Sequence, residues 1–109
     1  MTDRRAWEPP LFEWSQLGPV PIVLAPEVTI NDEALLGYSD TLERVIALDS
    51  TLEDRHLRVV HFHELLHLWL YDAGIHGLPE DLEEAIVHAL ATALVAREDF
   101  HGSGGVPEG

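Results

Sequence analysis

The segment 63–67, His-Glu-Leu-Leu-His, has the clearest chemical meaning in the chain. On a helix, residues four apart lie on one face, with Cβ atoms about 5–6 Å apart. His63 and His67 can therefore direct two imidazole nitrogens at one tetrahedral zinc ion. Glu64 stands beside the first histidine, where its carboxylate can take a proton from a zinc-bound water without being a ligand. The pattern predicts a zinc-dependent hydrolase with Glu64 as general base.

The motif could also arise by chance, because a chain of this composition is expected to contain the pattern about 0.05 times at random. The alternative interpretation is a histidine-rich helix with solvated rings and an ordinary surface glutamate. The motif, however, lies inside a stretch with helical apolar periodicity and precedes a second helical stretch rich in carboxylates. Four of the seven histidines also fall within residues 56–67. This context favours a metal site.

A third protein ligand is needed, and the downstream candidates are Glu83, Glu84, His76 and His88. Glu84 shares one stripe of the second helix with small and apolar residues, so it is expected to face the first helix. Glu83 is rotated from it by about 100° and is expected to be solvated. Glu84 is therefore the favoured third ligand, with the other three kept as alternatives.

Several other side chains near the motif have weaker assignments. His88 stands one helical turn after the favoured ligand, where it is expected to orient that ligand rather than bind the metal. His76 lies in the loop between the helices and is an additional candidate for binding metal or substrate. Tyr71 and His76 are the candidates for stabilising an oxyanion. His61 and His56 are expected to be structural or surface residues.

Two helices are expected to position these side chains. Ser50 and Glu53 have the spacing of a capping box, which predicts a helix start there. Apolar residues spaced by three and four positions over 59–70 predict one buried face. Gly74 is expected to end this helix in the left-handed conformation. The second helix is expected to span about 79–97, with a proline at its first position.

Short apolar runs before the helices predict strands at 21–25, 34–38 and 44–48, with a hairpin loop between the last two. Prolines beside the first run favour an edge or first strand. We therefore expect an α+β fold, with a short antiparallel sheet of two to three strands followed by two helices. The chain is divided into an aromatic and proline-rich arm, one domain and a flexible tail: residues 1–19, 20–100 and 101–109.

The composition allows one modest domain and excludes several classes of function. A chain of 109 residues with 46% apolar residues can bury a single core. The formal charge of −14 leaves no basic stripe for nucleic acid and disfavours an anionic membrane surface. The absence of cysteine restricts a metal site to histidine and carboxylate ligands. A polar N-terminus and the lack of a membrane-spanning stretch predict a cytoplasmic location.

These motifs together resemble a minimal gluzincin, in the style of the ImmA/IrrE-like metallopeptidases and the short phage-encoded minigluzincins. The resemblance covers about residues 35–96. It rests on Gly-Tyr at 37–38 with the strand-like 45–49, on the His-Glu-x-x-His motif, and on the segment 84–94. Metzincins and YbeY-type ribonucleases fit less well, because both place a third histidine where this chain has Ala73.

The resemblance implies a zincin-like domain in which His63, His67 and Glu84 bind Zn²⁺ and Glu64 is the catalytic base. The departure is His88, where the family tends to have Asn or Asp. The family also implies that a sheet edge holds an extended peptide by main-chain hydrogen bonds. Here that edge would be Val45, Ile46, Ala47 and Leu48.

The leading hypothesis is a zinc metallopeptidase acting on a peptide or protein substrate. The alternative is a catalytically inactive protein on a zincin scaffold, with a structural zinc or a protein-binding role. A fourth coordination position closed by His76 or His88 would favour that alternative. Because so short a chain has little material for a deep cleft, a homo-oligomer or a partner domain is a candidate to complete it.

Overall fold

The computed structural model of the protein describes residues 7–102. The strands are β1 (Phe12–Ser15), β2 (Gly18–Ala25), β3 (Val28–Ile30), β4 (Glu33–Leu35), β5 (Gly37–Asp40) and β6 (Val45–Asp49). The helices are α1 (Asp54–Asp72) and α2 (Glu80–Gly102). The predicted α+β class is confirmed. Residues 1–6 of the predicted arm and 103–109 of the predicted tail lie outside the described residues.

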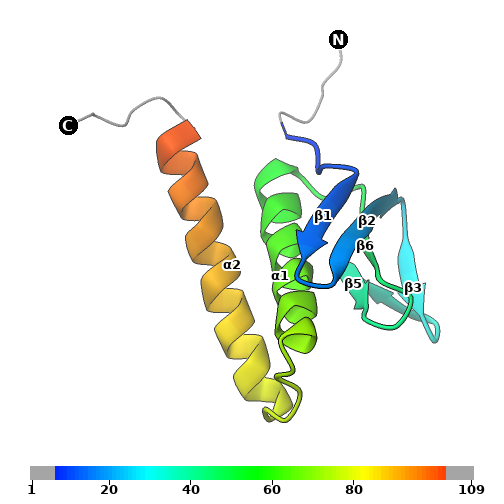
Figure 1. Ribbon diagram of the computed structural model, residues 1–109. Helices are drawn as coiled ribbons and strands as arrows, with labels where there is room; N and C mark the ends of the chain where they lie inside the picture. Colours follow the sequence, from blue (N-terminus) through cyan, green and yellow to red (C-terminus); the bar gives the residue numbers. More distant parts are fainter. Residues whose placement is uncertain (1–6, 103–109) are drawn as a thin grey trace.

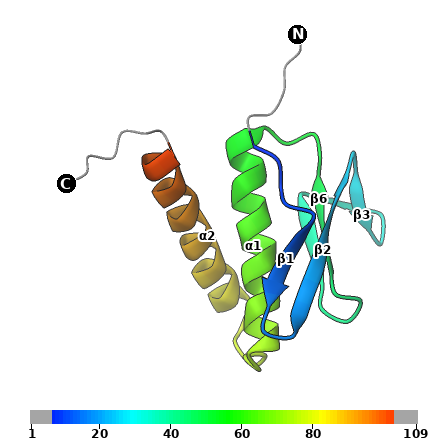
Figure 2. The same cartoon turned by 45° about the horizontal axis from the view of Figure 1, so that its top comes forward.

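The elements form three layers with α1 in the middle, between the sheet and α2 (Figures 1 and 2). Leu65 and Leu68 of α1 are fully buried in a core shared with the sheet. Leu66 lies on another face and packs with Val87 and Ala91 of α2. A helix covered on two sides needs apolar residues on both faces. The prediction of one buried face was therefore too narrow.

The main sheet has four strands in the order β1-β2-β6-β5, and it is mixed. β2 pairs in parallel with β6, whereas β1–β2 and β5–β6 are antiparallel. The prediction of an antiparallel sheet of two to three strands is therefore wrong. β2 and β6 run parallel because they are not consecutive strands. The β3–β4 hairpin and β5 lie between them in sequence and return the chain to the end of the sheet where β2 began.

The segment predicted to be an arm contributes β1 to this sheet. Its aromatic side chains do not all pack onto the fold, since Phe12 and Trp14 are 52% and 67% exposed. Trp7 does pack against the core, where its ring meets His61 edge-on with centroids 5.3 Å apart. Of these three aromatic residues, Trp7 packs against the core, whereas Phe12 and Trp14 remain largely exposed.

β2 is the second strand and lies between β1 and β6, although its prolines favoured an edge or first strand. The N–H of Ile22 bonds to the carbonyl of Leu11, so hydrogen-bonded pairs with β1 alternate with the proline positions. The nitrogens of Pro19 and Pro21 therefore face the other side, where pairing with β6 begins only at Ile22. Neither proline removes a hydrogen bond from a ladder, which is why an interior strand tolerates both.

The start of α1 differs from the prediction. Glu53 is the N-cap and makes no side-chain cap bond, so the predicted capping box with Ser50 is wrong. The carboxylate of Asp49 instead accepts hydrogen bonds from the N–H and the hydroxyl of Thr51, at 2.9 and 2.7 Å. This Asx-type turn occupies the residues that the capping box required and delays the helix to Asp54.

Gly74 ends α1 as predicted. Its φ is 85°, and the N–H of Ile75 bonds back to the carbonyl of Leu70, as in a Schellman motif. α2 begins near the predicted residue but extends to Gly102, beyond the expected end near 97. Neither helix within residues 7–102 has the length and apolar character needed to cross a membrane.

The part of α2 beyond its predicted end forms ion pairs with α1. Arg58 of α1, whose side chain is 12% exposed, contacts Glu98 at 3.3 Å and Asp99 at 2.6 Å. Arg55 also contacts Asp99, at 3.1 Å. These contacts hold the last turns of α2 against the first turns of α1, and no local sequence signal indicated them.

A second ion pair joins β1, the β5–β6 turn and the end of α1. Arg44 donates to both carboxylate oxygens of Asp72, at 2.7 and 2.8 Å, and to the hydroxyl of Ser15 at 2.9 Å. Ser15 also donates to Asp72, whose side chain is fully buried. The Arg44 guanidinium holds the pKa of the Asp72 carboxyl below its usual range. The network keeps Arg44 at a φ of 62°, which non-glycine residues seldom adopt.

Candidate metal centre

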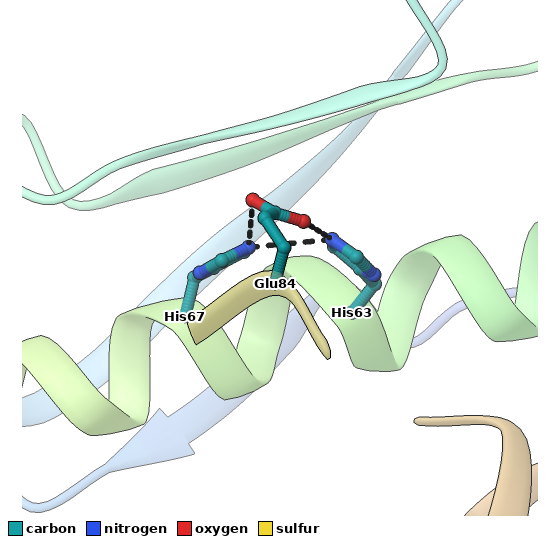
Figure 3. Close-up of side chains that lie close together, drawn as sticks. All are labelled: His63, His67 and Glu84. Carbon is teal, nitrogen blue, oxygen red and sulfur yellow. Dashed lines mark hydrogen bonds and ion pairs between the residues drawn. The ribbon is translucent and has the colours of Figure 1, made fainter. Parts of the chain in front are cut away.

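α1 and α2 bring three ligand-type side chains together. His63 and His67, one turn apart on α1, have their Nε2 atoms 3.3 Å apart. Glu84 of α2 places Oε1 2.9 Å from Nε2 of His63 and Oε2 3.0 Å from Nε2 of His67 (Figure 3). Their ligand atoms all lie within 4.8 Å of one another, the one such group within residues 7–102. The structure thus assembles the three side chains predicted as ligands.

The separations between these atoms fit a shared zinc ion. Ligand atoms bound to tetrahedral zinc at about 2.0–2.2 Å lie about 3.3–3.6 Å from one another. The nitrogen–nitrogen distance of 3.3 Å matches this spacing, and the two oxygens of Glu84 each approach a different histidine, at 2.9 and 3.0 Å. Two imidazoles and one carboxylate are also a donor set that suits zinc. The residues present therefore fit the metal.

Glu83 contacts the other nitrogen of the second histidine. Its Oε2 lies 2.7 Å from Nδ1 of His67, and its side chain is 24% exposed. The prediction that Glu83 is solvated is therefore wrong. α2 starts against α1, so two consecutive glutamates reach the same imidazole from different sides. Glu84 contacts Nε2 and Glu83 contacts Nδ1.

The remaining candidates lie outside the three-residue group. His88 is exposed, and its ring lies edge-on to that of His63 with centroids 6.3 Å apart. His76 contacts the main-chain oxygen of Tyr71 through Nε2, at 2.9 Å, and stacks on the Tyr71 ring with centroids 4.4 Å apart. His76 and Tyr71 thus bind each other at the end of α1. The structure does not bring them, or His88, among the ligand atoms.

Glu64 lies on α1 beside His63 and packs against β5. Burial raises the pKa of its carboxyl, and the neighbouring His63 and a hydrogen bond with Ser39 oppose that rise. Its charge also interacts with His67 and Glu84. The Glu64 carboxyl is therefore largely shielded from water and adjoins the three clustered side chains.

Gly37 allows β5 to approach Glu64 closely. A Cβ atom at this position would lie 2.6 Å from Cγ1 of Val60 and 3.1 Å from Cγ of Glu64. The first distance is shorter than van der Waals contact permits, so any other residue would push β5 away from α1. The close approach explains why a glycine occupies the start of this strand.

The replacement Gly37→Ala is expected to reduce the free energy of unfolding by about 1–3 kcal/mol, because the added methyl overpacks the β5–α1 contact. Gly77→Ala is the matched control, since a Cβ there meets nothing within 4 Å. The control should stay within about 0.5 kcal/mol of the wild type. Denaturant unfolding measures both, and equal stabilities of the two variants would refute the close-packing argument.

The edge of the sheet beside the site is β5, not β6. β6 pairs on both sides, so the prediction of Val45–Leu48 as the open edge is wrong. The N–H of Asp49 bonds to the carbonyl of Leu36, and hydrogen-bonded pairs alternate along an antiparallel ladder. The main-chain groups of Gly37 and Ser39 therefore point away from β6, toward the open edge. The local pattern located the hairpin but not which of its strands is outermost.

His61 has a structural position, as predicted. Its side chain is 1% exposed, and its ring lies edge-on to Phe62. Burial lowers the pKa of His61 to about 4, so the ring is neutral at pH 7. Its Nε2 lies 2.9 Å from a carboxylate oxygen of Glu13 on β1. His56 is exposed on α1, in line with the surface assignment.

One contact residue was missed in the sequence, and another was kept as an alternative ligand but expected to face solvent. Glu83 directly precedes the favoured ligand, and that adjacency was the available signal, but its direction on an isolated helix pointed to solvent. Ser39 was assigned to a polar loop, although it belongs to β5 and hydrogen-bonds Glu64. No local pattern reveals that contact, because it depends on how closely β5 approaches α1.

Comparisons of the chain with protein-family models, with curated proteins and with solved structures give no match. The case for a function therefore rests on the geometry of the centre itself.

Proposed function

We propose that the protein is a zinc-dependent peptidase, with His63, His67 and Glu84 as metal ligands and Glu64 as general base. The observation that carries the proposal is the convergence of His63, His67 and Glu84, whose ligand atoms all lie within 4.8 Å of one another. The general base follows the first ligand directly in sequence, on the same helix. This gives the centre both a metal-binding set and a proton acceptor.

The metal and Glu64 have different roles in the proposed reaction. When bound, the metal supplies Lewis acidity, which polarises a carbonyl and makes a nearby water easier to deprotonate. Glu64 accepts the proton of the attacking water and can return it to the leaving amine. Ser39 holds the Glu64 carboxylate from the strand side. The centre is partly open, with Glu84 49% exposed, so a substrate can reach it.

A peptide substrate fits the open edge of β5. The N–H and carbonyl groups of Gly37 and Ser39 that point away from β6 can form a ladder with an extended chain. Ser39 also touches Glu64, so a peptide paired with this strand passes close to the proton acceptor. The substrate-binding strand in this proposal is therefore β5, in place of β6.

The geometry favours catalysis over a purely structural zinc. A structural site closes its fourth position with a protein ligand. The two candidates for that position, His76 and His88, lie outside the ligand group, and His76 is turned toward Tyr71. Within residues 7–102, three side chains converge, and in this proposal a water or a substrate takes the remaining position.

Incubation of the zinc-loaded protein with a mixture of unstructured peptides tests this function, with new termini identified by mass spectrometry. We expect cleavage that stops when a chelator removes the metal and returns when one equivalent of zinc is added. Cleavage that continues at the same rate in the chelated protein would point to a contaminating activity. No cleavage by protein shown to hold zinc would reject the peptidase.

A further inference from the structure

The contact between Glu83 and His67 has a consequence for the metal centre. Glu84 and Glu83 occupy opposite nitrogens of one imidazole, with oxygens 3.0 Å from Nε2 and 2.7 Å from Nδ1. The Nε2 atom also faces His63, so the metal position lies on that side. We propose that Glu83 is a positioning residue that holds His67 through Nδ1 and raises its affinity for the metal. This inference rests on the proposed zinc site.

The hydrogen bond selects the form of the ring that binds metal. An ionised carboxylate can only accept, so the 2.7 Å contact requires the proton of His67 to be on Nδ1. When a metal is bound, this leaves the lone pair of Nε2, which faces His63 and Glu84, to bind it. A carboxylate on the far nitrogen also makes the imidazole a stronger donor.

The surroundings of Glu83 strengthen this contact. Its side chain is 24% exposed and that of His67 is 17% exposed, so water competes only partly for the bond. Glu83 also lies in the first turn of α2, where the helix dipole favours a negative charge. Within the described residues, Nδ1 of His63 has no carboxylate at this distance. The two histidine ligands are therefore unequal, and His67 is the one held from both sides.

Zinc affinity of the full chain, measured by competition with a colorimetric chelator, tests the inference. Glu83→Ala removes the acceptor and should weaken zinc binding about 10–100-fold. Glu83→Gln keeps an acceptor oxygen but loses the charge, so its affinity should fall between those of Glu83→Ala and the wild type. The controls Glu80→Ala and Glu80→Gln remove the same charge from the same helical turn. They should stay within about threefold of wild type, as expected for an exposed charge.

A second readout examines His67 without metal. Nitrogen chemical shifts of the ring in metal-free protein at pH 8 report which nitrogen carries the proton. We expect Nδ1–H in the wild type and in the Glu80 variants, and a shift toward Nε2–H in Glu83→Ala. A fold-stabilising role alone would not change this tautomer. The Glu83→Gln variant has nearly the original shape and carries the test if Glu83→Ala does not fold.

The outcomes separate this inference from the proposed function. Zinc bound by the wild type with equal affinity in the Glu83 and Glu80 variants would overturn the role of Glu83 and leave the zinc site intact. A wild-type protein that binds no zinc would reject the zinc site, and the role of Glu83 with it. The graded order of affinities, with the tautomer change, supports both.

Discussion

Glu64→Gln is expected to lower peptide hydrolysis by about 10²–10⁴-fold, the usual contribution of a general base. The amide has nearly the shape of the carboxylate but cannot take a proton at neutral pH. Glu64 is not one of the three converging ligands, so zinc affinity should change little. The measurement is the initial rate of cleavage by wild type and variant, each loaded with one equivalent of zinc.

The decisive control for Glu64→Gln is bound zinc, determined in the same samples. A variant that has lost both zinc and activity would show that Glu64 supports the site rather than the proton transfer. A variant that retains zinc and cleaves at the wild-type rate would remove Glu64 from the mechanism. Glu80→Gln, which neutralises a glutamate outside the group of converging ligand atoms, should retain both zinc and rate.

Asp72→Ala is expected to lower the free energy of unfolding by about 3 kcal/mol, more than the control substitutions. The substitution leaves the Arg44 guanidinium without its buried partner and removes an acceptor from Ser15. The substitution removes the carboxylate that joins β1, the β5–β6 turn and the end of α1. Denaturant unfolding at pH 7 measures the effect. Asp32→Asn in the exposed β3–β4 turn is the charge control and should stay within about 0.5 kcal/mol of the wild type.

The stabilisation by Asp72 should depend on pH in a defined direction. The Arg44 guanidinium lowers the pKa of the folded-state carboxyl below its unfolded value, which is about 3.9. The contribution is therefore fully present above about pH 4 and is lost as the pH falls through the lower folded-state pKa. The difference between wild type and Asp72→Asn should shrink below pH 4. A difference that grows toward acid would contradict the assignment.

The parts of the centre that lie within single helices were predictable from sequence. The spacing of His63 and His67 determines that both project from one side of a helix, whatever surrounds it. The position of Glu84 on the apolar stripe of α2 predicted correctly that it faces α1. Gly74 marked the end of α1, because few other residues adopt a φ of 85° without strain.

The parts that depend on neighbouring elements were not predictable from local pattern. The order of strands in a sheet depends on which distant segments pair with each other. The apolar periodicity along one strand carries no information about its partners. The open edge was therefore placed on β6 instead of β5. The prediction that Glu83 is solvated was wrong for a related reason. A helical wheel gives the direction of each side chain around one helix axis, but it does not show how closely a second helix approaches. Its long side chain reaches His67 across that approach.

The most direct test of the central claim is the metal content of untagged protein, purified without added metal and measured by mass spectrometry. If His63, His67 and Glu84 form a zinc centre, the wild type should carry about one zinc per chain. His67→Ala should carry none, and Glu80→Ala should keep the wild-type content. A wild type that holds no zinc, even after incubation with excess zinc, would contradict the account.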